Sequence, residues 1–219
     1  MTKFLRLSTF IVLAGIVFSC GGPQGEKAQT GDAQEVSAST GDVTMNVNAT
    51  ASKVEWTGAK PTGQHNGTIG ISEGSLMLTD GNIVGGKFII DMNSIVDLDL
   101  TNAEDNGKLV GHLKSPDFFD AAKYPTAVFE ISSVEVVSGN ANATHNITGN
   151  LTMKEITKSV TFPANVVIEG NQLMATTPEF IIDRSKWNVQ YGSRSFFNDL
   201  KDKFINDEIA LKINLSAGM

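Results

Sequence analysis

The chain has 219 residues, a formal net charge of −7 and a single cysteine. The acidic balance argues against nucleic acid as a partner and against attraction to anionic lipid headgroups, because both require a basic surface. One cysteine excludes an intramolecular disulfide framework, so the folded part must be stabilised by the burial of apolar side chains.

Residues 1–19 have the layout of an export signal. A basic start is followed by an apolar run that ends at Phe18, and this run is shorter than the roughly 20 residues that span a bilayer. The sequence Val17-Phe18-Ser19-Cys20 resembles the lipobox that lipoprotein signal peptidase reads, although Phe18 is bulkier than the small residue usual there. We expect Cys20 to be lipidated; the alternative is an ordinary signal peptide with a coincidental cysteine.

Residues 20–42 are predicted to form a lipidated, disordered tether. Gly, Ser, Thr, Ala, Gln and Glu dominate this segment, and Val36 is its one bulky apolar residue between positions 21 and 41. Such a composition cannot bury enough surface to offset the entropy lost on ordering. The folded domain is therefore expected over residues 43–219.

From residue 43 onward, apolar and polar residues alternate in short segments, which is typical of β-strands with one buried face. Asp80-Gly81 and Glu169-Gly170-Asn171 are hairpin signals between apolar runs. One apolar face per strand favours a single antiparallel sheet closed into a barrel, since closure removes exposed edges. The segments with the clearest alternation are 53–58, 87–92, 127–132, 146–153, 160–169 and 208–216.

Residues 103–124 break this pattern and are predicted to form short helices. Ser115 before Pro116 suits a helix N-cap followed by proline at the first helical position. A second short helix is expected near 196–203. The apolar residues expected to face the barrel mouth are Leu109, Leu113, Phe118 and Phe119.

Five stretches carry a recognisable pattern, and they are 54–58 (VEWTG), 88–95 (FIIDMNSI), 112–129 (HLKSPDFFDAAKYPTAVF), 147–154 (ITGNLTMK) and 182–187 (IDRSKW). In this order they resemble the YceI-like family of periplasmic, lipocalin-shaped proteins. The resemblance implies an all-β fold: an eight-stranded antiparallel lipocalin-like β-barrel with short helical lid segments and a long apolar interior. It also implies a binder or carrier of a polyisoprenoid or another long-chain amphiphile, not an enzyme. Two departures are Glu155, where a glycine is usual, and Trp187, where phenylalanine is common.

The candidate cavity residues are apolar and lie in the predicted strands or the lid. For each one alone, an ordinary core position is the simpler interpretation, and the resemblance favours a cavity. The set is Trp56, Phe88, Ile90, Phe118, Phe119, Phe129, Ile131, Phe162, Phe180, Ile182 and Trp187.

The headgroup candidates are His112, Lys114, Asp183 and Arg184. The planar fork of Arg184 suits a phosphate or carboxylate; the alternative is that it pairs with an acid and stabilises a turn. His112 is better suited to packing the lid than to contacting ligand.

No metal site is expected, because His65, His112 and His145 have no close histidine or cysteine partner in the sequence. Asp97 and Asp99 are interpreted as part of a solvated loop. No motif of a catalytic nucleophile, a zinc protease or a nucleotide-binding loop is found, so neither an enzyme nor a cofactor other than bound lipid is expected.

The predicted function is a lipid-anchored carrier that holds a polyisoprenoid or fatty amphiphile in an apolar cavity. The alternative is a structural or interaction module with a filled barrel that displays loops to a protein or glycan. The expected location is the cell envelope, at the outer membrane, because Gly21 and not aspartate follows the anchor cysteine. The periplasmic side is expected, and exposure at the cell surface is left open. A homodimer is left open.

Overall fold

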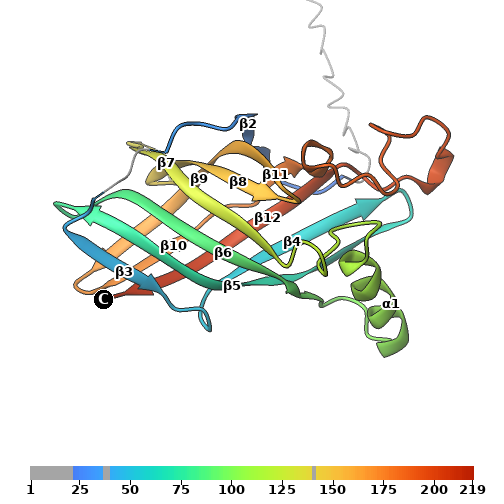
Figure 1. Cartoon of the computed structure of the whole chain (residues 1–219), viewed down its shortest axis with the longest axis horizontal. Coiled ribbons are helices and arrows are strands. Elements are labelled where there is room, and N and C mark those ends of the chain that lie inside the picture. The colour runs from blue at the N-terminus through green and yellow to red at the C-terminus, as the bar shows by residue number, and fades with distance from the viewer. Residues whose placement is uncertain (1–21, 37–39, 140–141) are drawn as a thin grey trace, which may run out of the picture.

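The computed structural model of the chain describes residues 22–36, 40–139 and 142–219. Cys20 and the export signal expected over residues 1–19 lie outside the described residues. Figure 1 shows one elongated sheet structure with helix α1 at one end. No helix in the described ranges is long and apolar enough to cross a membrane.

Twelve strands in the described residues form one hydrogen-bonded sheet. Their bounds are β1 (Glu26–Lys27), β2 (Gln29–Asp32), β3 (Val43–Val47), β4 (Lys53–Lys60), β5 (Gly63–Thr79), β6 (Asn82–Asp97), β7 (Thr126–Val136), β8 (His145–Met153), β9 (Ile156–Glu169), β10 (Gln172–Thr176), β11 (Phe180–Asp183) and β12 (Glu208–Gly218).

The sheet closes into a ring of eight positions, which we call the ring. Strands β5 to β9 pair in sequence order, β10 follows β9, and β12 follows β10. Strand β12 then pairs with β4 and β3, and both of these pair with β5, which completes the circuit. Strands β3 and β4 share one position, and β10 and β11 share another, because each pair contacts successive parts of β12. The predicted closed antiparallel sheet is confirmed.

The alternation of apolar residues places their side chains inside the ring. All six predicted segments are strands, namely β4, β6, β7, β8, β9 and β12, and the predicted turns at Asp80-Gly81 and Gly170-Asn171 join β5 to β6 and β9 to β10. Strand β5 was implied only by the turn at its end and was not among the segments with clear alternation. Its pairing with β6 has bulges between Thr68 and Gly70 and between Ile71 and Glu73, which shift the phase of the alternation.

The N-terminal segment corrects one expectation. Residues 26–32, predicted to be disordered, contain β1, which pairs with β11 in parallel, and β2, which pairs with β9. Asn150 also accepts a hydrogen bond from the Gln34 amide at 2.9 Å and donates one to the Gln34 carbonyl at 2.7 Å. The composition argument was wrong here because strand pairing uses backbone groups, which every non-proline residue supplies.

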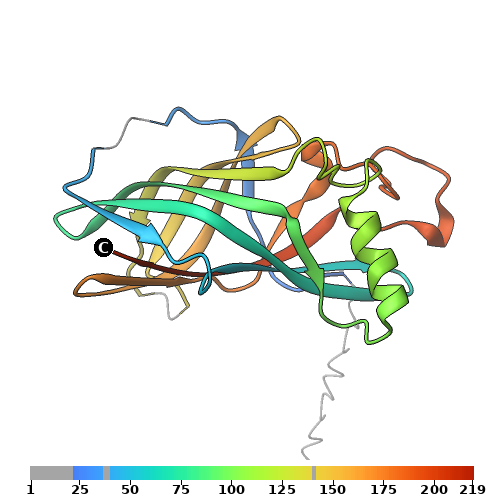
Figure 2. The same ribbon diagram turned by 60° about the horizontal axis from the view of Figure 1, so that its bottom comes forward.

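Helix α1 (Ala103–Lys114) lies across one end of the ring (Figure 2). Its N-cap is Asn102, whose side chain accepts hydrogen bonds from the amides of Glu104 and Asp105. Ser115 is the C-cap and not the predicted N-cap, and its hydroxyl donates to the His112 carbonyl at 2.8 Å. Residues 115–124 are turns, so the predicted second helix after Pro116 is wrong.

The segment 188–207 lies at the same end as α1 (Figures 1 and 2). It follows the short 3-10 helix η1 (Arg184–Trp187), and the helix expected near 196–203 is only the 3-10 turn η2 (Lys201–Lys203). We call the end of the ring formed by α1, residues 115–124 and residues 188–207 the mouth. The opposite end carries the C-terminus and the turn between β5 and β6.

Candidate functional site

Two adjoining apolar chambers occupy the interior of the ring. The mouth chamber has a volume of about 160 Å³ and the deep chamber about 90 Å³. No polar atom contributes to the free surface of either chamber. Both volumes are below the range of roughly 300–1,000 Å³ typical of pockets for drug-sized ligands, so a slim chain fits better than a bulky ring system. Residues that line both chambers are Val54, Ile90, Phe129, Phe162 and Ile213.

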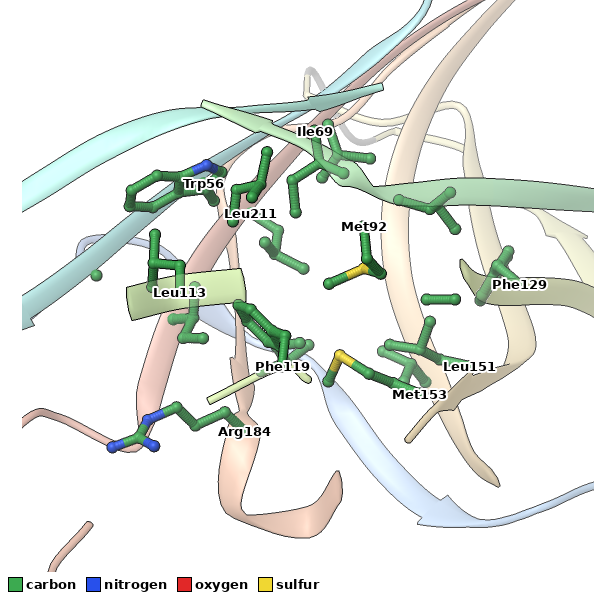
Figure 3. Close-up of a pocket in the computed structure, with 18 of the residues that line it drawn as sticks. Trp56, Ile69, Met92, Leu113, Phe119, Phe129, Leu151, Met153, Arg184 and Leu211 are labelled. Atoms are coloured by element: carbon green, nitrogen blue, oxygen red, sulfur yellow. The ribbon is translucent and has the colours of Figure 1, made fainter. Parts of the chain in front are cut away.

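Helix α1 and the turns of residues 115–124, which together we call the lid, cover the mouth chamber. Leu113 from the last turn of α1 and Phe118 and Phe119 from the following turns are buried against it. In the view of Figure 3, Phe119 lies between Leu113 and the two methionines Met92 and Met153. Methionine side chains are flexible and polarisable, so these two can re-pack around a ligand chain at little cost.

A row of phenylalanine rings crosses the interior. The ring centroids of Phe88 and Phe129 are 6.3 Å apart, those of Phe129 and Phe162 are 5.5 Å apart, and those of Phe162 and Phe180 are 4.6 Å apart. A Cβ atom at Gly149 would overlap the Phe129 ring, so this glycine makes room for the row. The strand pattern thus brings together aromatic residues that are far apart in the sequence.

Ten of the eleven predicted cavity residues line a chamber. Trp187 does not: it is fully buried, and its Nε1 donates to the Leu151 carbonyl at 2.9 Å, which ties η1 to β8. The residues that line at least one chamber are Trp56, Phe88, Ile90, Phe118, Phe119, Phe129, Ile131, Phe162, Phe180 and Ile182.

Arg184 borders the mouth chamber, but its guanidinium does not face it. The group is turned away from the chamber in Figure 3 and has no exposed surface. It donates to four backbone carbonyls, those of Val189 at 2.7 Å, Tyr191 at 2.9 Å, and Ile205 and Asn206 at 3.1 Å each.

The Arg184 guanidinium also lies 3.4 Å from a carboxylate oxygen of Asp207 and stacks 5.1 Å from the centroid of the Phe118 ring. Burial lowers the pKa of Arg184, and the nearby Asp207 opposes this effect. An arginine stays protonated in proteins, so the buried charge is compensated by these partners. The headgroup role of Arg184 is therefore not supported, and the alternative that it stabilises a turn by pairing with an acid fits the contacts.

The other three headgroup candidates do not line a chamber. Asp183 is the N-cap of η1 and accepts hydrogen bonds from the amide and hydroxyl of Ser185 at 2.9 and 2.6 Å. His112 packs edge-on between the rings of Phe118 and Tyr191, with centroid distances of 5.9 and 4.4 Å, as the lid interpretation expected. Lys114 lies in the last turn of α1.

Lys154 contacts the lid and is not the fully solvated lysine that is the default for such a position. Its Nζ donates to the Phe118 carbonyl at 2.8 Å from the two-residue turn between β8 and β9. Burial lowers the pKa of this lysine. The bond fixes the turn that carries Phe118 to the edge of the ring, so Lys154 helps to hold the lid closed.

His65, Asp97 and Asp99 form the one group of potential metal ligands found in the described part of the chain, with one ligand atom of each within 4.8 Å of the others. Asp97 is buried and not solvated as expected, and its Oδ1 accepts from the Leu100 amide and the Asn106 side chain.

Burial raises the pKa of Asp97, and the neighbouring Asp99 adds to this. Burial also acts to raise the pKa of Asp99, but hydrogen bonds from the Asn66 amide and His65 hold it below its ordinary value. The contacts of this group fix the end of β6 to the start of α1. The group is therefore explained as a structural anchor of the lid.

Several chamber residues were missed by the sequence interpretation. Ile69 lies on the bulged strand β5, while Met92 and Met153 lie in the predicted segments 87–92 and 146–153. The alternation places these two methionines on the apolar faces of β6 and β8, although they were not among the predicted cavity residues. Ile205 could not be placed in this way, because it lies in the irregular segment 188–207.

Comparison with known proteins places the chain among proteins of this shape. The sequence profile of the YceI-like domain matches residues 29–217. A UPF0312 protein of Pseudomonas paraeruginosa is 39% identical over 85 residues, which is 39% of each chain. Protein YceI of Escherichia coli is 31% identical over 105 residues, or 48% of this chain and 50% of that protein. The chain thus spans half or less of the length of these relatives.

Two solved structures share the fold. The crystal structure of Burkholderia cenocepacia BcnA has a TM-score of 0.56 at 25% identity and covers 78% of this chain and 98% of that one. A polyisoprenoid binding domain from Saccharophagus degradans, implicated in plant cell wall breakdown, has a TM-score of 0.56 at 16% identity and covers 80% and 97%. The second likeness concerns the fold alone.

Proposed function

The chain belongs to the family of YceI-like domains, and from that premise we propose that it is a lipid-anchored carrier which holds the tail of a polyisoprenoid or another long-chain amphiphile inside the ring. The observation that carries this proposal is the pair of chambers with wholly apolar free surfaces under a lid. The polyisoprenoid binding domain from Saccharophagus degradans, which has the same fold, supports the ligand class.

The shape of the interior favours a tail over a compact ligand. The two chambers are adjacent along the ring, and Phe129 and Phe162 lie between them. Each buried CH₂ contributes roughly 0.8 kcal/mol, so affinity depends on how many carbon atoms the chambers admit. The described residues offer no charged group facing a chamber, so the headgroup is expected outside the mouth.

The anchoring part of the proposal rests on the sequence around Cys20. A diacylglycerol on this cysteine would hold the domain at the outer membrane, facing the periplasm, where an apolar ligand is loaded or delivered. The proposal includes no catalytic step.

One observation favours the second candidate, a filled ring that serves as an interaction module. The chambers are small, and the phenylalanine row occupies much of the interior. In that case the side chains are ordinary core, and the loops would carry the function.

A displacement titration separates the two candidates. The delipidated protein is mixed with a fluorescent polyene fatty acid, and the emission is followed while a polyprenol is added. The carrier proposal predicts enhanced emission that the polyprenol reverses. A matched pair of variants locates the binding: Ala127→Phe fills the mouth chamber, whereas Val128→Phe adds the same ring to the neighbouring residue on β7, which lines neither chamber.

Loss of the enhancement in Ala127→Phe alone supports binding inside the ring. No enhancement in the parent protein, or equal loss in both folded variants, would favour the filled-ring module.

A further inference from the structure

The mouth has an outer groove that shares a wall with the mouth chamber. The groove lies between the turn joining β4 to β5, with Lys60 and Gln64, and the end of segment 188–207. Ile205 and Asn206 line both the groove and the mouth chamber. These two residues therefore form the wall that a ligand would cross between the groove and the interior.

The N-terminal end of the described chain lies in this groove. Gly22 lines it, and Pro23 is buried. From there β1 is hydrogen-bonded to the edge of β11 and β2 to β9, so the segment is not free to swing away from the mouth. Two peptide bonds separate Gly22 from Cys20, which limits the distance between their Cα atoms to about 7.6 Å.

The loop beside the groove exposes aromatic side chains. Tyr191, Phe196 and Phe197 are 45%, 41% and 46% exposed. Phenylalanine and tyrosine on a surface are suited to the interface between water and lipid, because their rings can enter the headgroup region. Exposed apolar side chains also occur elsewhere, for example Val136 and Met174, so exposure alone does not select the mouth. The position of Gly22 in the groove selects the mouth, because the anchor cysteine is only two residues away in the chain.

We propose that the mouth docks on the surface of a phospholipid bilayer, with Tyr191, Phe196 and Phe197 in the headgroup region and the outer groove as the path of the ligand between membrane and chamber. The inference rests on the proposed lipid anchor at Cys20 and adds the orientation of the domain to it. The net charge of −7 makes attraction to anionic lipid an unsuitable driving force. The anchor and the aromatic side chains supply the contact instead.

The test uses the full acylated chain, purified from bacterial membranes and placed in phosphatidylcholine vesicles whose acyl chains carry bromine, a short-range quencher of tryptophan emission. A tryptophan is introduced by Phe197→Trp at the mouth or by Val136→Trp at the opposite end of β7, where Val136 is 68% exposed. The parent protein, with Trp56 and Trp187 both buried, gives the baseline. Circular dichroism and co-sedimentation with vesicles establish that each variant is folded and attached. A Phe196→Trp variant repeats the measurement if Phe197→Trp fails to fold.

We expect the emission added by Phe197→Trp to be quenched at least twofold more than that added by Val136→Trp. Equal quenching at the two ends, stronger quenching at Val136→Trp, or no quenching at either in vesicle-bound protein overturns the docking proposal. A protein whose intact mass shows no diacylglycerol overturns it as well. A mouth that instead binds a second copy of the chain would show a dimer and no quenching. In each of these cases the polyprenol titration with delipidated protein still decides the carrier function separately.

Discussion

The Nε of Arg184 donates a 3.1 Å hydrogen bond to the carbonyl oxygen of Asn206, a residue on the boundary between the mouth chamber and the outer groove. A buried cation on η1 thereby fixes the position of an irregular segment that forms one wall of the mouth. Neutral backbone carbonyls compensate much of its charge, which leaves little of the guanidinium for a lipid headgroup.

Replacing this cation should unfold the mouth. In Arg184→Met, Asp207 loses its ion-pair partner and four carbonyls lose their donor, so we expect a loss of about 3–5 kcal/mol in the free energy of unfolding, as for a broken buried ion pair. Urea denaturation measures the change. Lys186→Met, at an exposed position two residues away, should stay within about 0.5 kcal/mol of the parent. A stable Arg184→Met protein that only loses affinity for anionic lipid would restore the headgroup interpretation.

The two chambers should select ligands by length. Ala127→Phe narrows the mouth chamber and should lower the retention of both 15-carbon and 40-carbon isoprenoids. Ala164→Leu fills only the deep chamber and should lower retention of the longer chain alone. Overpacking costs about 1–3 kcal/mol, so thermal melts must show that both variants are folded. Equal effects on both lengths in Ala164→Leu would mean that the deep chamber is not used.

Glycine at position 155 should stabilise the fold. Lys154 and Glu155 form the turn between β8 and β9 with φ values of 49° and 64°, which favour glycine. Glu155→Gly should raise the free energy of unfolding by about 1 kcal/mol, because a left-handed conformation costs a side-chain-bearing residue roughly this amount. Lys154→Gly relieves the same strain but loses the bond to the Phe118 carbonyl, so it should gain less. A larger gain in the free energy of unfolding for Lys154→Gly than for Glu155→Gly would contradict the role of Lys154 in holding the lid.

The contributions of the Asp97 and Asp99 carboxylates to stability should depend on pH in opposite directions. The pKa of Asp97 is raised in the folded state, so folding binds protons and stability falls as pH rises above the unfolded value of about 3.9. Relative to the parent protein, Asp97→Asn should therefore have a more favourable effect on the free energy of unfolding at pH 7 than at pH 4. The pKa of Asp99 is lowered, so its contribution is present at pH 7 and is lost in acid.

Accordingly, Asp99→Asn should destabilise the protein at pH 7 and have little effect at pH values below the lowered pKa. Melting temperatures across pH 3–8 check both variants. The same sign for the two variants at pH 7 would contradict the opposite pKa shifts of Asp97 and Asp99.

The fold was predictable where strands are regular. The inward residues of β4, β6, β7 and β9 follow the period-two pattern, which is why Trp56, Phe88, Phe129 and Phe162 were found. The alternation on β5 was missed because a bulge reverses its phase between Ile71 and Leu76.

The mouth was less predictable. The partners of Arg184 come from backbone groups of segment 188–207, which has no periodic pattern, and β1 and β2 are fixed by backbone pairing that composition does not reveal. The chambers themselves depend on small volumes left between packed side chains, which a sequence pattern does not resolve.

The central claim is that the ring carries a long apolar chain, and native mass spectrometry of protein purified gently from bacterial membranes tests it most directly. The account predicts an adduct released by organic solvent, with the mass of an isoprenoid or another long-chain lipid. The adduct should be depleted in Ala127→Phe and retained in Val128→Phe. Bare polypeptide mass, with or without the covalent anchor, across several growth conditions would contradict the account.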